Sequence, residues 1–152
     1  MDPIDRRMIG LLQANGRITN VDLAQRVGLT APPCLRRMRA LEERGFITGY
    51  HAALDASAMG YAITAFAMVS LRSQAEVDLV EFERHVAGIP EVRECHMLNG
   101  EIDFLLKIVA TDLASFQSIL TASLTTAPHV ASVKTSLTIR TAKNEPGVPV
   151  DD

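Results

Sequence analysis

The spacing of hydrophobic residues changes near residue 60 of the chain. Before that point, apolar residues recur every three or four positions, which is the spacing of helices with one buried face. Three such stretches follow Asp2, Thr19 and Thr30, residues that commonly cap helix N-termini. After residue 60, alternating apolar runs are separated by two further helical stretches. The pattern predicts a helical domain followed by a domain built around a sheet.

The segment from Thr19 to Arg44 has the pattern of a helix-turn-helix. Gly28 follows the first of its two helices, where a glycine readily takes the left-handed conformation that ends a helix. The second helix carries apolar residues on one side and arginines around the other. Since such motifs place the start of this helix in the major groove, we expect binding to double-stranded DNA. The candidate DNA-contacting residues are Thr30, Ala31, Pro33, Arg36, Arg37 and Arg39.

The second half alternates strands and helices in the order β-α-β-β-α-β. The strand patterns cover residues 62–72, 92–98, 103–110 and 130–141, and the helical patterns cover residues 75–87 and 112–127. This order predicts a ferredoxin-like module, an antiparallel sheet with both helices on one face. Asn99-Gly100 predicts a two-residue hairpin turn between the middle strands. The fold class is therefore α+β, a winged helix-turn-helix followed by a βαββαβ module.

We expect four parts along the chain. Residues 1–46 form the DNA-binding domain, residues 47–61 a hinge strand and linker, residues 62–143 the βαββαβ domain, and residues 144–152 a flexible tail. The net charge of −3 conceals an asymmetry between these parts. Residues 1–60 contain eight arginines and six acidic residues, a balance of +2, whereas the remainder carries −5. This separation suits a DNA-facing part joined to a part with another role.

The composition limits which other classes of protein the chain could belong to. Of the 152 residues, 47% are hydrophobic and 22% charged, as in ordinary globular proteins. No apolar run approaches the roughly 20 residues that span a bilayer, and no signal-peptide pattern is seen, so we expect a cytoplasmic protein without a membrane partner. Cys34 and Cys95 lie in apolar patterns and are predicted to be small buried residues without a disulfide.

Several short motifs resemble the Lrp/AsnC family, the feast/famine transcriptional regulators of bacteria and archaea. They are Ile4-Asp5-Arg6, Gly16-Arg17-Ile18, Arg26-Val27-Gly28-Leu29, Pro33-Cys34-Leu35, Arg37-Met38-Arg39, Gly45-Phe46-Ile47, Glu94-Cys95-His96 and Gly100-Glu101-Ile102-Asp103. The resemblance covers nearly the whole chain apart from the tail. It implies dimers that form through the second module and assemble to octamers or beyond. It also implies that residues 47–54 pair with the partner at a two-fold axis.

The resemblance further implies that a small effector, typically an amino acid, binds between second modules and changes assembly and DNA affinity. The matching loop forms part of the effector pocket in the family, although Asn-Gly by itself indicates only a good β-turn. Asp103 would offset the ammonium group, and the loop N–H groups would receive the carboxylate. The candidate effector-binding residues are Met97, Leu98, Asn99, Gly100, Glu101, Asp103, Leu113, Ser136 and Leu137.

Two other functions are weighed against this one. Glu94 and His96 share a face of one strand with Asp103 nearby, a set that could hold a metal or exchange protons. No metal-ligand spacing, nucleophile motif or phosphate loop accompanies them, so we predict no catalytic residues, no metal and no cofactor. A DNA-binding protein that responds to no effector, acting in nucleoid architecture or as a constitutive repressor, remains the alternative.

Overall fold

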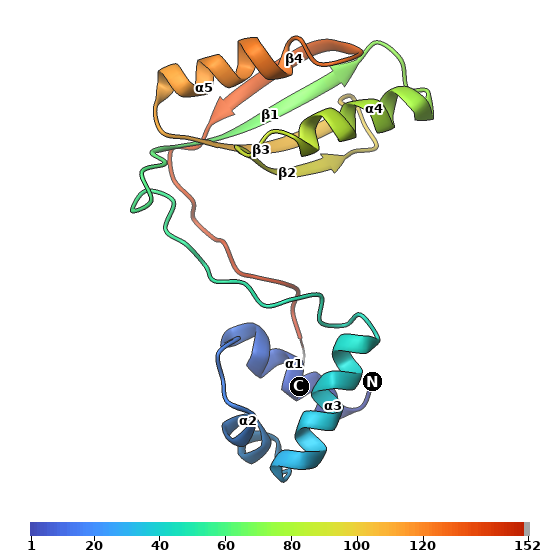
Figure 1. The fold of residues 1–152 in the computed structure, drawn as a ribbon, viewed down its shortest axis with the longest axis vertical. Coiled ribbons are helices and arrows are strands. Elements are labelled where there is room, and N and C mark those ends of the chain that lie inside the picture. Colours follow the sequence, from blue (N-terminus) through green and yellow to red (C-terminus); the bar gives the residue numbers. More distant parts are fainter. Residues whose placement is uncertain (151–152) are drawn as a thin grey trace. The chain divides into compact units, whose positions relative to one another are not determined.

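The computed structural model describes residues 1–150, which form two compact units (Figure 1). Unit 1 contains Met1–Ala53 together with the segment that starts at Lys143, and unit 2 contains Leu54–Ala142. Unit 1 is helical, and unit 2 combines a four-stranded sheet with helices. The α+β class predicted from the spacing of apolar residues is confirmed.

Unit 1 contains three helices, α1 (Pro3–Ala14), α2 (Asn20–Val27) and α3 (Ala31–Glu43). The side chain of Asp2 accepts a hydrogen bond from the backbone N–H of Asp5, so the predicted cap of α1 is present. This bond stabilises the start of α1, because the first turn of a helix has N–H groups without intrahelical partners.

The bend between α2 and α3 is built as the sequence indicated. Thr19 caps α2 by accepting a 3.1 Å hydrogen bond from the N–H of Asp22. Gly28 ends α2 with φ at 74°, the left-handed conformation expected of it. Thr30 precedes α3 in an extended conformation, but its side chain makes no capping hydrogen bond. The three helices pack around the fully buried side chains of Met8, Leu23, Ala24, Cys34 and Leu41, which confirms the burial predicted for Cys34.

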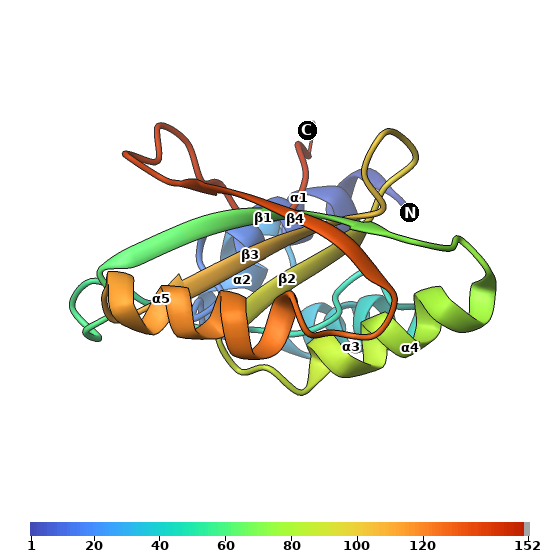
Figure 2. The same cartoon turned by 90° about the horizontal axis from the view of Figure 1, so that it is seen from above.

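Unit 2 is built on a sheet with the strand order β2-β3-β1-β4, in which all neighbours are antiparallel. The strands are β1 (Ile63–Leu71), β2 (Val92–Met97), β3 (Phe104–Ala110) and β4 (Val130–Leu137). The helices are α4 (Glu76–Ala87), α5 (Leu113–Ile119) and the π-helical turn η1 (Leu120–Leu124) that continues α5. Figure 2 shows α4 and α5 on the same side of the sheet. This is the predicted ferredoxin-like arrangement.

The two faces of the sheet differ in burial. Alternate residues of β1 and β3 are buried against the helices, with Ala65, Val69, Phe104, Leu106 and Ile108 all fully buried. The residues between them face away from the helices, because neighbouring residues of a strand point to opposite sides. That second side, which we call the open face, has no covering element from unit 2.

The connection between β2 and β3 differs from the predicted two-residue turn. The ladder ends at the pair Met97 and Phe104, so residues 98–103 form a six-residue loop. Neither Asn99 nor Gly100 has a positive φ, which a type I′ turn requires at both central positions. The predicted hairpin turn is therefore wrong. The Asp103 backbone bonds instead to β1, where its N–H donates to the carbonyl of Val69.

The burial expected of Cys95 needs correction. Cys95 is exposed, because β2 is an edge strand that α4 covers only in part. Leu113, one of the candidate effector-binding residues, is 59% exposed at the start of α5. Residues 47–54 form no strand in the described chain. Pairing of that segment with a second copy stays a prediction.

The segment after Lys143 makes specific contacts within unit 1. The Gln13 side chain donates a 2.8 Å hydrogen bond to the carbonyl of Val148 and accepts one from its N–H at 3.3 Å. Nothing in the sequence had indicated this contact. The flexibility expected of residues 144–150 stays a prediction, and Asp151 and Asp152 lie outside the described residues.

Candidate functional site

The exposed side of α3 carries the candidate DNA-contacting residues. Arg36 and Arg39 are exposed, and within residues 1–150 neither takes part in an ion pair. Thr30 is also exposed at the start of the helix, while Ala31 and Pro33 are half-buried. The Asn20 side chain donates a hydrogen bond to the carbonyl of Ala31, which fixes the start of α3 against α2. Unpaired guanidinium groups on a rigid helix suit contacts with phosphates and guanine edges.

Arg37, another of the candidate DNA-contacting residues, has partners within its own chain. Its Nη1 donates to a carboxylate oxygen of Asp2 and to Oδ1 of Asp5, the latter at 2.8 Å. These bonds raise the pKa of Arg37, while the N–H of Asp5 and then the guanidinium lower the pKa of the Asp2 carboxyl. Arg37 therefore ties the middle of α3 to the start of α1. A DNA contact by the same group stays a prediction.

The loop of residues 98–103 is the centre of the predicted effector site. Leu98, Asn99, Gly100 and Glu101 are exposed, and only the N–H of Leu98 continues the ladder, by donating to the carbonyl of Asp103. A β-carbon added to Gly100 would meet no atom within 4 Å. The loop therefore offers free backbone to a ligand and leaves room for one.

Asp103 has a structural role in this unit. Its side chain is buried, and Oδ2 accepts a 2.7 Å hydrogen bond from the backbone N–H of Leu71. Oδ1 accepts a 3.0 Å hydrogen bond from the Gln74 side chain. The pairing of β1 with β4 shifts register between Ser70 and Leu71, and the carboxylate satisfies the N–H at that irregularity. The predicted contact between Asp103 and an ammonium group stays a prediction.

The predicted effector-binding residues form two separate groups within one chain. Met97 and the loop lie at the edge strand β2, where β3 begins. Ser136 and Leu137 lie on β4, the opposite edge of the sheet, and Leu113 starts the helix that follows β3. Strands are about 4.8 Å apart, so three strand spacings alone separate the edges by roughly 14 Å. One chain does not bring the two groups into a common pocket.

Glu94 and His96 lie side by side on the open face, as predicted, with Lys107 added by the fold. Glu94 accepts a 2.9 Å bond from the Lys107 ammonium and lies 3.2 Å from Nε2 of His96. Lys107, and to a smaller extent His96, lower the pKa of the Glu94 carboxyl. Asp103 is not part of this group, because its carboxylate bonds to Leu71 and Gln74. The ion pair between Glu94 and Lys107 therefore accounts for the position of Glu94 and His96 without a catalytic or metal-binding role.

A helix-turn-helix with exposed arginines, joined to a separate α+β module, defines the chain as a DNA-binding regulator. The profile of the winged helix-turn-helix DNA-binding family matches residues 1–48, and that of the Lrp/AsnC ligand binding domain matches residues 64–148. The chain belongs to the Lrp/AsnC family of transcriptional regulators.

Its relatives cover almost the full length. A leucine-responsive regulatory protein of Rhizobium meliloti is 52% identical, over 95% of this chain and 92% of the relative. The Bkd operon transcriptional regulator of Pseudomonas aeruginosa is 39% identical, over 92% of each. The crystal structure of a Neisseria meningitidis transcriptional regulator in complex with L-Met superposes with a TM-score of 0.94 at 34% identity, covering 99% of this chain and 97% of that one. Within residues 1–150, no helix is long and apolar enough to cross a membrane.

Sequence reasoning missed several partners that the fold supplies. Gln74 and the N–H of Leu71 hold Asp103, and Lys107 pairs with Glu94, yet no local spacing links these positions. The sequence indicated Asp2 only as a helix cap and Asp5 only as part of a family motif, although both also bind Arg37. Charge opposition between the acidic start of α1 and the arginines of α3 was the one available signal.

Proposed function

We propose that this protein is a sequence-specific transcriptional regulator whose assembly and DNA affinity respond to an amino acid, with an apolar side chain as the preferred class. The single observation that carries the proposal is the joining of an arginine-bearing helix-turn-helix to an Lrp/AsnC ligand binding domain. The 52% identical relative is named as leucine-responsive, and the Neisseria regulator was crystallised with L-Met. Those names support an apolar amino acid as the first class to test.

The proposal places the effector between copies of unit 2. The loop of residues 98–103 and the group formed by Leu113, Ser136 and Leu137 lie apart in one chain, so a shared pocket needs residues from a second copy. In this arrangement the loop N–H groups bind the carboxylate, as they do for anions in other turns. An effector bound between copies then favours one assembly over another, and DNA affinity follows by linkage.

The open face is the proposed dimer surface. Phe66 is 36% exposed there, and Met68, Leu105 and Val109 are half-buried beside it. Apolar side chains on an uncovered sheet are well suited to pairing with a second sheet. The variant Phe66→Glu should lower the mass measured by sedimentation velocity, whereas Val77→Glu, at a 70% exposed position on α4, should not. Equal masses for both variants would refute the proposal that the open face forms the dimer. The same experiment measures assembly beyond the dimer, to octamers.

DNA binding is tested on Arg36 and Arg39, because replacement of Arg37 would also remove its bonds to Asp2 and Asp5. Each of Arg36→Ala and Arg39→Ala should weaken operator binding in fluorescence anisotropy, and a phosphate contact should also lower the salt slope by about 1. Arg93→Ala is the control, since Arg93 is exposed in unit 2 and, among residues 1–150, its side chain bonds only to the carbonyl of Pro90. Unchanged affinity in both α3 variants would exclude this face of the helix.

Effector binding is tested by isothermal titration of the full chain with each proteinogenic amino acid. We expect leucine or methionine to bind, and the ligand to change both the sedimentation coefficient and the affinity for DNA. Gly100→Ala should lower the affinity for the amino acid if the loop backbone approaches it closely. The added methyl group meets no other atom of the protein within 4 Å. If no amino acid binds while DNA binding persists, the protein is an effector-independent architectural or constitutive regulator instead. The proposal assigns no catalytic step and places the protein in the cytoplasm.

A further inference from the structure

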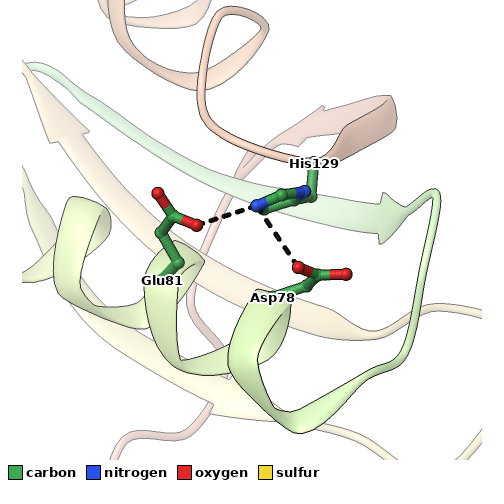
Figure 3. A group of neighbouring side chains, drawn as sticks. All are labelled: Asp78, Glu81 and His129. Atoms are coloured by element: carbon green, nitrogen blue, oxygen red, sulfur yellow. Dashed lines mark hydrogen bonds and ion pairs between the residues drawn. The ribbon is translucent and has the colours of Figure 1, made fainter.

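Three side chains with metal-binding atoms meet on the helix side of unit 2. Asp78 and Glu81 lie one turn apart on α4, and His129 lies in the turn between η1 and β4 (Figure 3). Nε2 of His129 is 2.9 Å from Oε2 of Glu81 and 3.5 Å from Oδ1 of Asp78. One ligand atom from each residue lies within 4.8 Å of the others. Neither the DNA-binding helix nor the predicted effector site includes these residues.

Neither carboxylate pairs with a lysine or an arginine of the described residues. In the described part of the chain, the ion pairs of Asp78 and Glu81 involve His129 alone. Nε2 of an imidazole carries at most one hydrogen, so a neutral histidine can donate to only one of the two carboxylates that face it. The group around Glu94 and His96 differs, because there the Lys107 ammonium supplies the positive charge. The pair on α4 therefore has no ammonium or guanidinium partner within 4.0 Å among the described residues, which leaves room for a cation there.

Two of the three distances between the ligand atoms fit an ion of the zinc class, and the third, between the two carboxylate oxygens, is within 4.8 Å. Metal–nitrogen and metal–oxygen bonds of about 2.1 Å place neighbouring ligand atoms about 3.0–3.4 Å apart in octahedral or tetrahedral geometry. The 2.9 and 3.5 Å distances around Nε2 lie close to that range. Imidazole with carboxylates is a ligand set for borderline divalent ions, whereas calcium and magnesium prefer oxygen ligands alone.

The surrounding backbone holds the histidine in place. His129 has φ at 64°, and its carbonyl accepts a 2.8 Å hydrogen bond from the N–H of Arg72 at the end of β1. Asp78 and Glu81 lie three residues apart, a spacing that puts both on the same side of α4. The side chains of Asp78 and His129 are 18% and 34% exposed, so the cluster is partly shielded and still open to solvent on one side. Water can complete the coordination there.

From this geometry we propose that Asp78, Glu81 and His129 form a binding site for one divalent transition-metal ion per chain, with Zn²⁺ as the representative ion. The ion links the first turns of α4 to the start of β4. The sequence had predicted no metal, because 48 residues separate His129 from Glu81 and no local spacing joins them. The proposal concerns a second ligand of unit 2 and is independent of the amino-acid effector.

The test is isothermal titration of the full-length protein, without an affinity tag, with zinc chloride. Wild type should bind one Zn²⁺ per chain. His129→Asn removes the imidazole but keeps a residue that tolerates positive φ, and Glu81→Gln changes a half-exposed side chain. Each variant should lower the affinity for Zn²⁺ at least about tenfold. Tenfold is the smallest loss seen when even an outer-shell partner of a metal ligand is removed. His96→Gln is the matched control and should retain the wild-type stoichiometry and affinity.

A spectroscopic and a thermal readout make the result decisive. Co²⁺ bound to wild type should give visible absorption that is absent with His129→Asn. Zn²⁺ should raise the melting temperature of wild type and of His96→Gln but not that of His129→Asn, since an ion that binds the folded state stabilises it. Without metal, the variants should have the circular dichroism spectrum of wild type. The proposal fails if wild type shows no saturable Zn²⁺ binding, if His129→Asn binds equally well, or if His96→Gln abolishes binding.

Discussion

Replacement of Asp103 separates a structural role of this carboxylate from a ligand-binding one. In Asp103→Ala, the N–H of Leu71 loses its hydrogen-bond acceptor, and Leu71 is only 8% exposed, so water cannot readily replace it. A buried donor without a partner costs about 1–3 kcal/mol, and the lost bond from the more accessible Gln74 adds about 1 kcal/mol. We expect unit 2 to lose about 2–4 kcal/mol of its free energy of unfolding.

The loss should be visible in thermal unfolding. For a domain of 60–100 residues, 1 kcal/mol shifts the midpoint by about 4–8 °C, so a loss of about 2–4 kcal/mol should lower the unfolding temperature of Asp103→Ala by roughly 8–32 °C. Asp103→Asn should fall between the two, because its amide oxygen can still accept from the N–H of Leu71. The scans are run by differential scanning calorimetry at one protein concentration, since assembly couples concentration to stability.

The matched control is Glu101→Ala, which removes an exposed carboxylate from the same loop. Surface substitutions of this kind stay within about 0.5 kcal/mol. If Asp103→Ala unfolds at the wild-type temperature, the hydrogen bonds to Leu71 and Gln74 carry no stability and the structural argument is wrong. If it folds normally and fails only to bind the amino acid, the ammonium contact is supported instead.

Three further predictions concern stability. Gly28→Ala should destabilise unit 1 by about 1–2 kcal/mol in urea unfolding, because φ is positive at this position. No other atom lies within 4 Å of the added β-carbon, so backbone strain is the only cost. Gly100→Ala, at a position without positive φ, should leave the stability unchanged. Lys107 holds the pKa of Glu94 below its usual value, so their pairing stabilises the fold above about pH 4.5 and is lost as the pH falls through the lowered pKa. Acid unfolding of Glu94→Gln should therefore show a weaker pH dependence in that window. Gln13→Ala removes both hydrogen bonds to the tail and should speed amide exchange there, as measured by hydrogen–deuterium exchange.

The features that sequence alone predicted are those that depend on neighbours close along the chain. The cap at Thr19 and the left-handed Gly28 follow from bonds within four residues, and both are present. The apolar run over residues 62–72 predicted a strand, and β1 lies there with Ala65 and Val69 buried against the helices. The order of elements then selected the ferredoxin-like sheet, since few topologies satisfy it.

The features that sequence could not give depend on distant partners. Asn99-Gly100 is a strong local signal for a tight turn, but the Asp103 backbone bonds to Val69 and its carboxylate bonds to Leu71, so the ladder ends earlier. The helix-turn-helix pattern placed Arg37 among the candidate DNA-contacting residues without showing that Asp2 and Asp5 lie beside it. Local periodicity gives the direction of a side chain and leaves its tertiary neighbours undetermined.

The contact between Gln13 and Val148 has a consequence for how the protein is made. Unit 1 is assembled from two stretches of chain, and all of unit 2 lies between them in the order of synthesis. The three helices around Met8 and Leu41 precede β1 in the chain and can pack as soon as they have left the ribosome, but the tail contact has to wait until β4 has emerged. A nascent chain that has exposed α3 but not yet the tail would therefore present a packed helical core that lacks this last contact.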